Sequence, residues 1–395
     1  MHRSVFIILL NSWIKVGADM LVSFSMVIRF FSTILLSLIL TPIFKIISVQ
    51  TGMVDKPNER RINKVPMPSA GGLPIFLSFV ASTLFFFRDI IPKFYILPIL
   101  FAASVIIITG VLDDKFELTP KQKSVGILLA SLIIYFVADI HIDSFTLPFF
   151  GYIELGWLSF PVTIFWIFGI TNAVNLIDGL DGLAAGISLI GLITIGIIGY
   201  FFLHASTVYI PIVIFCLVAS IIGFLPYNFY PAKIYLGDTG ALFLGFMMAV
   251  LSLQGLKNVT FVSSISLLIV MGVPVTDTFF AIVRRKANRV SFSTADKKHL
   301  HHRLMSLGFT HKGAVLTIYA IALMFSFTAM IMNYTGELGT IVLIISMLFA
   351  AILLFELIGL INEKHQYILK TLRFLGNKEY RTQVIQKYKK KWNRR

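Results

Sequence analysis

The chain has 395 residues, of which 57% are hydrophobic and only 13% are charged. Ordinary soluble domains carry roughly 25% charged residues, so this composition excludes both a water-soluble globule and a disordered chain. The mean hydropathy of +0.86 instead places most of the chain in a lipid bilayer. A net charge of +15 would suggest nucleic-acid binding in a soluble protein, but here it needs another explanation.

Apolar runs of about 17 to 25 residues predict an all-α, polytopic integral membrane protein with about eleven transmembrane helices (10–11). Most basic residues, 27 of the 34 Lys and Arg, fall in loops on one side of these spans. Cytoplasmic loops collect Lys and Arg, so the N-terminus is expected outside and the C-terminus in the cytoplasm. The expected spans are 22–48, 71–87, 94–112, 124–140, 158–175, 183–203, 208–226, 240–256, 261–283, 313–333 and 340–361.

Three segments are expected along the chain. Residues 1–20 form an N-terminal extension or a misassigned start, because the apolar run from Val5 to Leu10 is too short to span and has no cleavage site. Residues 21–361 form the membrane domain, and 362–395 form a basic cytoplasmic tail that either contacts anionic headgroups or is simply solvated. Cys216 is the only cysteine, which excludes an internal disulfide and a cysteine-based metal site.

The first polar cluster is the pair Asp113 and Asp114, at the cytoplasmic end of the third span. Adjacent carboxylates repel each other, so they are stable chiefly beside a divalent cation, a lysine or a proton. Lys123 follows closely in the sequence. The pair therefore indicates either a cation or phosphate site or a hydrated loop balanced by lysines.

A second cluster contains Asn175, Asp178 and Asp181, spaced three and three. In a helix these residues would share one face. They could line a ligand site or form an interhelical hydrogen-bond seam. The third cluster is Asp238, between Gly237 and Thr239-Gly240 where a span begins. It could cap that helix or bind Mg²⁺ through hard oxygen ligands.

The fourth cluster is a histidine loop that contains His299, His301, His302 and Arg303. These side chains could donate to phosphate or sugar oxygens, bind a transition metal, or form a plain basic loop. Asp277, inside the ninth expected span, is expected to form a structural ion pair or to orient a cationic side chain. The basic residues of the loop 51–70 either hold a lipid phosphate or only mark the cytoplasmic side.

One membrane face thus gathers carboxylates, an asparagine, cations and histidines. This combination favours Mg²⁺-assisted phosphoryl transfer between a soluble polyphosphate and a lipid phosphate. The chain has no GxxxxGK sequence, which argues against a Walker-type nucleotide hydrolase.

The motifs Asp113-Asp114, NAVNLIDGLDGLAAG, YLGDTG, PVTDT and HLHHRL, in this order and spacing, resemble those of the polyprenyl-phosphate N-acetylhexosamine-1-phosphate transferases, glycosyltransferase family 4. The resemblance runs from about Leu21 to Ile361. Within the family, the histidine loop and PVTDT look like the bacterial undecaprenyl-phosphate GlcNAc-1-phosphate transferase branch of the teichoic acid linkage-unit type. The phospho-MurNAc-pentapeptide branch is less similar, because it has three consecutive histidines where this chain has His301, His302 and Arg303.

The resemblance implies a role for each matching residue. Asp238 with Asn175 would bind Mg²⁺, for which Mn²⁺ can substitute. Asp113 and Asp114 would organise or deprotonate the lipid phosphate, and Lys123 would contact phosphate. Asp178 and Asp181 would line the nucleotide pocket, with Asp181 facing uracil, while His301, His302 and Arg303 would contact sugar and pyrophosphate. The family's first loop often has His and Arg where this chain has Asn63 and Ser69, so that loop receives no role.

The implied reaction transfers GlcNAc-1-phosphate from UDP-GlcNAc to undecaprenyl phosphate and releases UMP, at the cytoplasmic face of the bacterial plasma membrane. It would be the first membrane step of a cell-envelope polymer such as wall teichoic acid. Membrane lipids and a homodimer are expected partners, and nucleic acid is not. The alternatives are the phospho-MurNAc-pentapeptide transferase and a secondary transporter. Transporters usually place their essential polar groups near the midplane, often in repeated halves.

Overall fold

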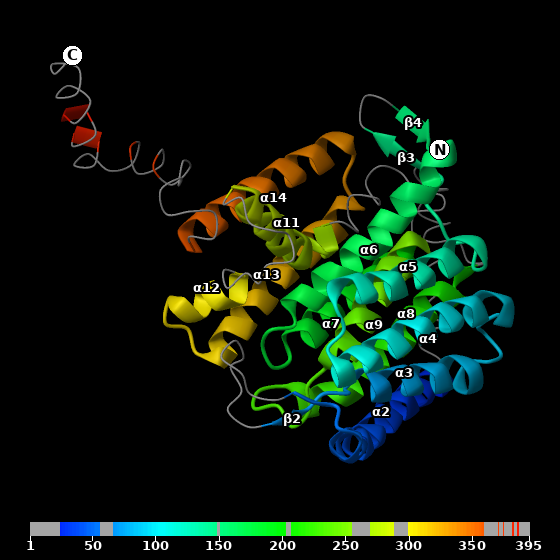
Figure 1. The fold of residues 1–395 in the computed structure, drawn as a ribbon. Helices are drawn as coiled ribbons and strands as arrows, with labels where there is room; N and C mark the ends of the chain where they lie inside the picture. Colours follow the sequence, from blue (N-terminus) through cyan, green and yellow to red (C-terminus); the bar gives the residue numbers. More distant parts are fainter. Residues whose placement is uncertain are drawn as a thin grey trace.

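The computed structural model describes residues 24–55, 66–147, 151–202, 207–254, 269–287 and 299–358, with a few positions beyond 369. The expected N-terminal extension (1–20), Asn63 and most of the basic tail (362–395) lie outside the described residues. The described part is a helical bundle with two short antiparallel strand pairs, and Figure 1 shows α11 to α14 gathered on one side and α2 to α5 on the other.

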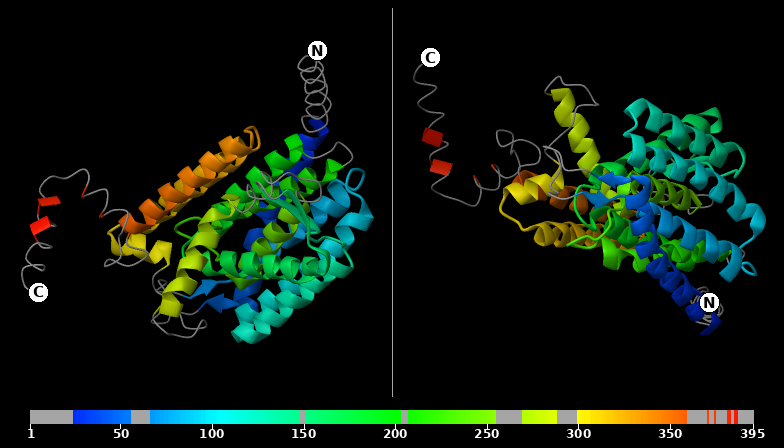
Figure 2. Two further views of the ribbon diagram at one scale, coloured as in Figure 1. Left: turned by 90° about the horizontal axis from the view of Figure 1, so that it is seen from above. Right: turned by 60° about the horizontal axis from the view of Figure 1, so that its bottom comes forward.

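The helices follow the expected apolar runs closely. They are α2 (Phe24–Thr51), α3 (Gly72–Ala81) with its π-helical continuation η1 (Ser82–Phe86), α4 (Lys93–Phe116), α5 (Pro120–Phe136), α6 (Ser159–Ile177), α7 (Leu183–Phe202), α8 (Tyr209–Asn228), α9 (Gly237–Gln254), α11 (Gly272–Ala287), α12 (Leu300–Ser306), α13 (His311–Met332) and α14 (Glu337–Ile358). A short 3-10 turn, η2 (Gly156–Leu158), precedes α6. Figure 2 shows the pair α13 and α14 side by side along one flank of the bundle.

The strands are two short hairpins. Strand β1 (Val54–Asp55) pairs with β2 (Met67–Pro68), with Val54 opposite Pro68. Strand β3 (Ser144–Leu147) pairs with β4 (Gly151–Glu154), with Ser144 opposite Glu154. The first hairpin lies at the end of α2, and its residue Ser69 continues into a bridge with Tyr235 just before α9.

The centre of the bundle is α9, which packs against α3, α4, α6 and α7. Nearly all of its residues are buried, including Phe243 and Phe246. Small residues allow this close packing, as is usual between membrane helices. A Cβ on Gly245 would lie only 2.9 Å from the Thr171 backbone of α6. The bundle therefore fixes the start of α9 against the ends of α4 and α6.

Among the described residues, seven helices are long and apolar enough to cross a membrane: α2, α4, α6 with η2, α7, α8, α9 and α13. Shorter apolar helices cover Gly72–Phe86 and Leu338–Leu354. The other two expected spans correspond to α5, with 17 residues, and α11, with 16. Helices of this length measure about 24 to 26 Å, slightly less than a hydrocarbon core of about 30 Å. The polytopic helical architecture is confirmed, while the count of eleven spans stays a prediction.

Arg29 lies within the first expected span, where an unpaired charge would be costly. Its guanidinium donates to both carboxylate oxygens of Asp89, at 2.6 and 3.0 Å. Asp89 lies in the turn after η1, and the hydrogen bond from Arg29 holds the pKa of this carboxyl below its usual value. The pair ties α2 to the end of the bundle opposite the start of α9.

Candidate active site

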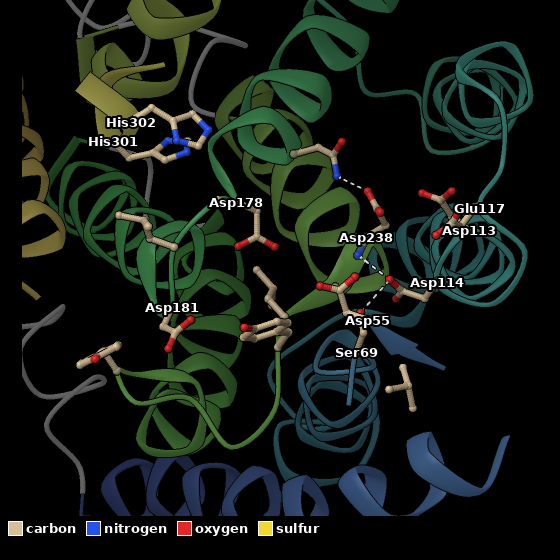
Figure 3. Close-up of a pocket in the computed structure, with 18 of the residues that line it drawn as sticks. Asp55, Ser69, Asp113, Asp114, Glu117, Asp178, Asp181, Asp238, His301 and His302 are labelled. Carbon is tan, nitrogen blue, oxygen red and sulfur yellow. Dashed lines mark hydrogen bonds between the residues drawn. The ribbon is translucent and has the colours of Figure 1, made fainter. Parts of the chain in front are cut away.

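A cavity of about 850 Å³ lies where the ends of α4 and α6 meet the start of α9. Ligand pockets typically have volumes of about 300 to 1,000 Å³. Figure 3 shows the polar side chains that converge on it from several elements. Nine of the ten predicted site residues line the cavity: Asp113, Asp114, Lys123, Asn175, Asp178, Asp181, Asp238, His301 and His302. Arg303 is not among the lining residues, although it follows them on α12.

The corner between α4 and α5 brings the lysine to the carboxylates. Helix α4 ends at Phe116, and the next residue, Glu117, has a left-handed φ of 51°. Helix α5 begins with a capping box, in which the Gln122 amide donates to Thr119 Oγ1 and the Thr119 amide donates to Gln122 Oε1. Pro120 at the first helical position suits this start, because its fixed φ is already helical. The sharp corner places Lys123 beside Asp113.

Lys123 links two carboxylates. Its ammonium forms an ion pair with Asp113 Oδ2 and lies 3.2 Å from Asp238 Oδ1. Asn175 Nδ2 donates to the same Asp238 oxygen at 2.5 Å, and Asp113 Oδ1 accepts from the Leu118 amide at 2.7 Å. Asp238, Asn175 and Lys123 therefore meet at one point, although they come from three helices.

Asp114 has different partners from its neighbour Asp113. Its Oδ1 accepts from Ser69 Oγ at 3.0 Å and from the Asp238 amide at 2.9 Å. Its Oδ2 accepts from the Thr239 amide at 3.0 Å and from Thr239 Oγ1 at 2.5 Å. The amides belong to the first turn of α9, where a carboxylate satisfies unpaired donors and the helix dipole. Asp114 thus caps α9 and holds Asp238 in place, and Ser69 gives the first loop a contact in the site.

Of the residues Asn175, Asp178 and Asp181, only Asn175 lies in a helix, so the three do not share a helical face. Helix α6 ends at Ile177, and the chain turns through Gly182, whose φ is +77°. Asp178 and Asp181 nevertheless line the same cavity from the loop 178–182. Burial raises the pKa of Asp178 well above its usual value, and neighbouring carboxylates, first that of Asp238, raise it further.

His301 reaches over this loop from α12. A Cβ on Gly179 would lie 2.6 Å from His301 Cε1, so only glycine leaves room for the imidazole. The ring is buried, and Nδ1 has no hydrogen-bond partner among the described residues. Burial, with a smaller contribution from His302, lowers the pKa of His301 to about 3. His301 is therefore a neutral hydrogen-bonding group at physiological pH.

Asp277 anchors the histidine helix. His299 Nδ1 lies 2.8 Å from Asp277 Oδ2, and the Leu300 amide donates to Asp277 Oδ1 at 2.9 Å. The partner of Asp277 is thus His299 of the histidine loop, and this contact fixes the first turn of α12. The segment 288–298 that precedes His299 lies outside the described residues.

Several lining residues were not selected from the sequence: Asp55, Ser69, Glu117, Tyr230, Tyr235 and His311. His311 is the first residue of α13, and its ring stacks on Tyr230 with centroids 4.5 Å apart. In the sequence, its position after Thr310, the N-cap residue of α13, indicates only the start of a helix and no functional role.

The charge balance of the lining is strongly negative. Seven carboxylates line the cavity together with one lysine and three histidines. An anionic substrate would be repelled unless further cations entered with it. Among the described residues, no group of three or more His, Cys, Asp or Glu is arranged to hold a metal ion by itself. Magnesium ions commonly use one or two carboxylates together with substrate phosphates, so the hard oxygen donors around Asp238 fit Mg²⁺ bound with a phosphorylated substrate.

Comparisons with known proteins agree with this chemistry. The model of glycosyl transferase family 4 matches residues 96–256. A probable undecaprenyl-phosphate N-acetylglucosaminyl 1-phosphate transferase of Bacillus subtilis (strain 168) is 43% identical over 341 residues, which cover 86% of this chain and 93% of the relative. A decaprenyl-phosphate N-acetylglucosaminephosphotransferase of Mycobacterium tuberculosis (strain CDC 1551 / Oshkosh) is 33% identical over 301 residues, 70% of this chain and 74% of the relative.

A phospho-N-acetylmuramoyl-pentapeptide-transferase of Halalkalibacterium halodurans is 29% identical over 328 residues, which cover 77% of this chain and 95% of the relative. The similarity to the Bacillus protein extends well beyond the segment that the family model matches. Because nearly the whole of that relative is aligned at 43% identity, this chain belongs to glycosyl transferase family 4.

Proposed function

We propose that this protein transfers GlcNAc-1-phosphate from UDP-GlcNAc to undecaprenyl phosphate, giving undecaprenyl-diphospho-GlcNAc and UMP. The observation that carries the proposal is the cavity in which seven carboxylates and Lys123 meet at the ends of membrane helices. Such a site lets a soluble phosphate ester reach a lipid phosphate. The name of the Bacillus relative describes a transferase of the same kind.

In the proposed reaction, an oxygen of the lipid phosphate attacks the β-phosphorus of UDP-GlcNAc. A new bond joins that oxygen to the phosphorus, and the bond from the phosphorus to the bridging oxygen breaks. UMP leaves with the bridging oxygen and its electron pair. A phosphate monoester is already largely ionised at pH 7, because its second pKa is near 6. A strong general base is therefore not required, and Asp113 has the simpler role of orienting Lys123.

Lys123 supplies positive charge to the transferring phosphoryl group, and the neutral His301 supplies a hydrogen bond to sugar or pyrophosphate. Asp238 and Asn175 would hold Mg²⁺ or Mn²⁺. When bound, this ion neutralises phosphate charge and polarises the reacting phosphoryl group. Asp114 keeps Asp238 at the start of α9 through the hydrogen bonds described above.

The proposal includes a place in the cell. The described acid-lined helix ends lie together at one end of the bundle. The sequence predicts that the basic loops lie at that same end, which would face the cytoplasm of a bacterial cell with the N-terminus outside. We propose eleven spans on this basis and the first membrane step of a cell-envelope polymer, such as wall teichoic acid, as the role.

A direct assay tests the proposed function. Purified full-length protein in detergent, with undecaprenyl phosphate and Mg²⁺, should release UMP from UDP-GlcNAc. Chelation with EDTA should abolish release, and Mn²⁺ should restore it. UMP from UDP-MurNAc-pentapeptide instead would support the pentapeptide transferase, to which the Halalkalibacterium relative gives some weight. No UMP from either donor would contradict the transferase and favour a transporter.

Replacing Gly179 by alanine is expected to lower kcat for UMP release by about 10- to 100-fold, because the new Cβ displaces His301 from its place over the loop. The melting temperature should change little. Gly169→Ala on α6 is the matched control, since a Cβ there meets nothing within 4 Å. Equal kcat values in the two variants would show that the position of His301 does not matter.

A further inference from the structure

The loop 178–182 is held by two side chains of α13. The Asp181 amide donates to His311 Nε2 at 3.0 Å, and the Tyr319 hydroxyl donates to the Gly182 carbonyl oxygen. His311 and Tyr319 are eight residues apart, so they lie on neighbouring parts of one helix face. Two consecutive residues of the loop are therefore fixed by one helix.

The surrounding packing is shaped for these contacts. Gly186 on α7 lies against the Tyr319 ring, and a Cβ there would overlap the phenol. On the other side, the His311 ring stacks on Tyr230, and the Ala232 amide donates to Asp181 Oδ2 at 2.9 Å. The loop 178–182 is thus bound both to α13 and to the segment 230–232 that leads to α9.

These contacts lie at one end of the cavity. Figure 3 shows Asp181 on the opposite side of the cavity from Asp113 and Glu117, with Asp178 between them. Asp181, Tyr230 and His311 all line the cavity, whereas Tyr319 is not among the lining residues. The contacts from α13 therefore fix the loop at the end of the cavity that is far from the corner between α4 and α5.

We propose that His311 and Tyr319 are positioning residues that set the loop 178–182 for the nucleoside diphosphate of the donor. This inference rests on the proposed function for the identity of the donor. Tyr319 acts only through the loop, and His311 requires a lone pair on Nε2, so its proton is on Nδ1. Because α12 and α13 follow each other in the chain, the same unit that carries His301 also fixes the loop beneath it.

Steady-state kinetics on the full-length protein in detergent test the proposal, with each substrate varied while the other is saturating. Tyr319→Phe removes one hydrogen bond and is expected to raise the KM for UDP-GlcNAc about three- to tenfold, with the KM for undecaprenyl phosphate within about twofold of wild type. His311→Phe keeps a ring against Tyr230 but loses the acceptor, so it should act similarly. His311→Gln can place Oε1 where Nε2 was, and should restore most of the affinity.

Tyr95→Phe is the matched control, because the buried Tyr95 hydroxyl has no hydrogen-bond partner among the described residues. Its KM for both substrates should equal that of wild type. Unchanged donor KM in Tyr319→Phe, or an equal rise in both KM values, would overturn the proposal, since a merely structural contact would not discriminate between substrates. If His311→Gln had no lower KM for UDP-GlcNAc than His311→Phe, the role of His311 as a hydrogen-bond acceptor would also be overturned.

Binding of UDP by calorimetry separates this inference from the proposed function. If wild type binds UDP but releases no UMP, the proposed reaction is wrong, and the weaker UDP binding of Tyr319→Phe still supports the positioning role. If UDP binds equally to wild type and Tyr319→Phe, the positioning role is wrong, whether or not UMP is released. If wild type binds no UDP at all, both are wrong.

Discussion

Asp238→Asn is expected to reduce UMP release by about a thousandfold or more, because under the proposed function the variant would lack the charge that binds a divalent cation together with the donor phosphates. Asparagine has nearly the same shape and can still accept the hydrogen bond from Asn175. The melting temperature in detergent should therefore stay close to that of wild type. Electron paramagnetic resonance of Mn²⁺ in the presence of UDP should show weaker binding of the ion to the variant.

A matched control is Asp139→Asn. Asp139 follows the C-terminal end of α5, which is the end farther from the site. The Asp139 side chain is 82% exposed, and its φ of 53° is a conformation that asparagine tolerates well. This variant should retain wild-type activity and Mn²⁺ binding. If Asp238→Asn kept activity within about tenfold of wild type, the assignment of Asp238 to the metal would be wrong.

The helices were the most predictable part of the fold. Each expected span contains a helix in the described structure, because long apolar runs have few other conformations in a bilayer. The grouping of Asp113, Asn175 and Asp238 was also predictable, since each lies at a helix end that the basic loops place on one side. Scarce charge in an apolar chain marks its functional residues.

The separate roles of Asp113 and Asp114 could not be predicted from their sequence. Adjacent residues on a helix point about 100° apart, so Asp114 meets the first turn of α9 while Asp113 meets Lys123. The sequence shows only two neighbouring carboxylates. Their partners are set by how α4, α5 and α9 pack, which no local pattern records.

His311 was missed for a related reason. It lies 130 residues from Asp181 in the chain, and its position at the start of a helix is unremarkable in itself. The loop 178–182 falls between two expected spans, and the three-residue spacing would put its carboxylates on one face only if it were helical. In the structure α6 ends at Ile177 and Gly182 has a φ of +77°, so these side chains reach the cavity from a turn. Long-range contacts of this kind arise only from the folded bundle.

Asp114→Ala is expected to destabilise the protein as well as inactivate it. The substitution removes one acceptor group and leaves the amides of Asp238 and Thr239, in the first turn of α9, without their partner in these part-buried hydrogen bonds. Each donor that loses its partner costs about 1 to 3 kcal/mol, so the two amides together cost about 2 to 6 kcal/mol. For a chain of this size that corresponds to a fall in melting temperature of about 5 to 10 °C.

Asp238→Asn is the comparison for this prediction. Both variants should lose activity, but only Asp114→Ala should also lose stability. Ser69→Ala removes one of the four donors to Asp114 and leaves the helix cap intact, so its melting temperature should fall by no more than about 2 °C. Thermal unfolding of the three variants, followed by tryptophan fluorescence in one detergent, measures their melting temperatures. Asp114→Ala should have the lowest of the three. A melting temperature of Asp114→Ala equal to that of wild type would mean that Asp114 does not hold the start of α9, and its carboxylate would then have to act on the substrate itself.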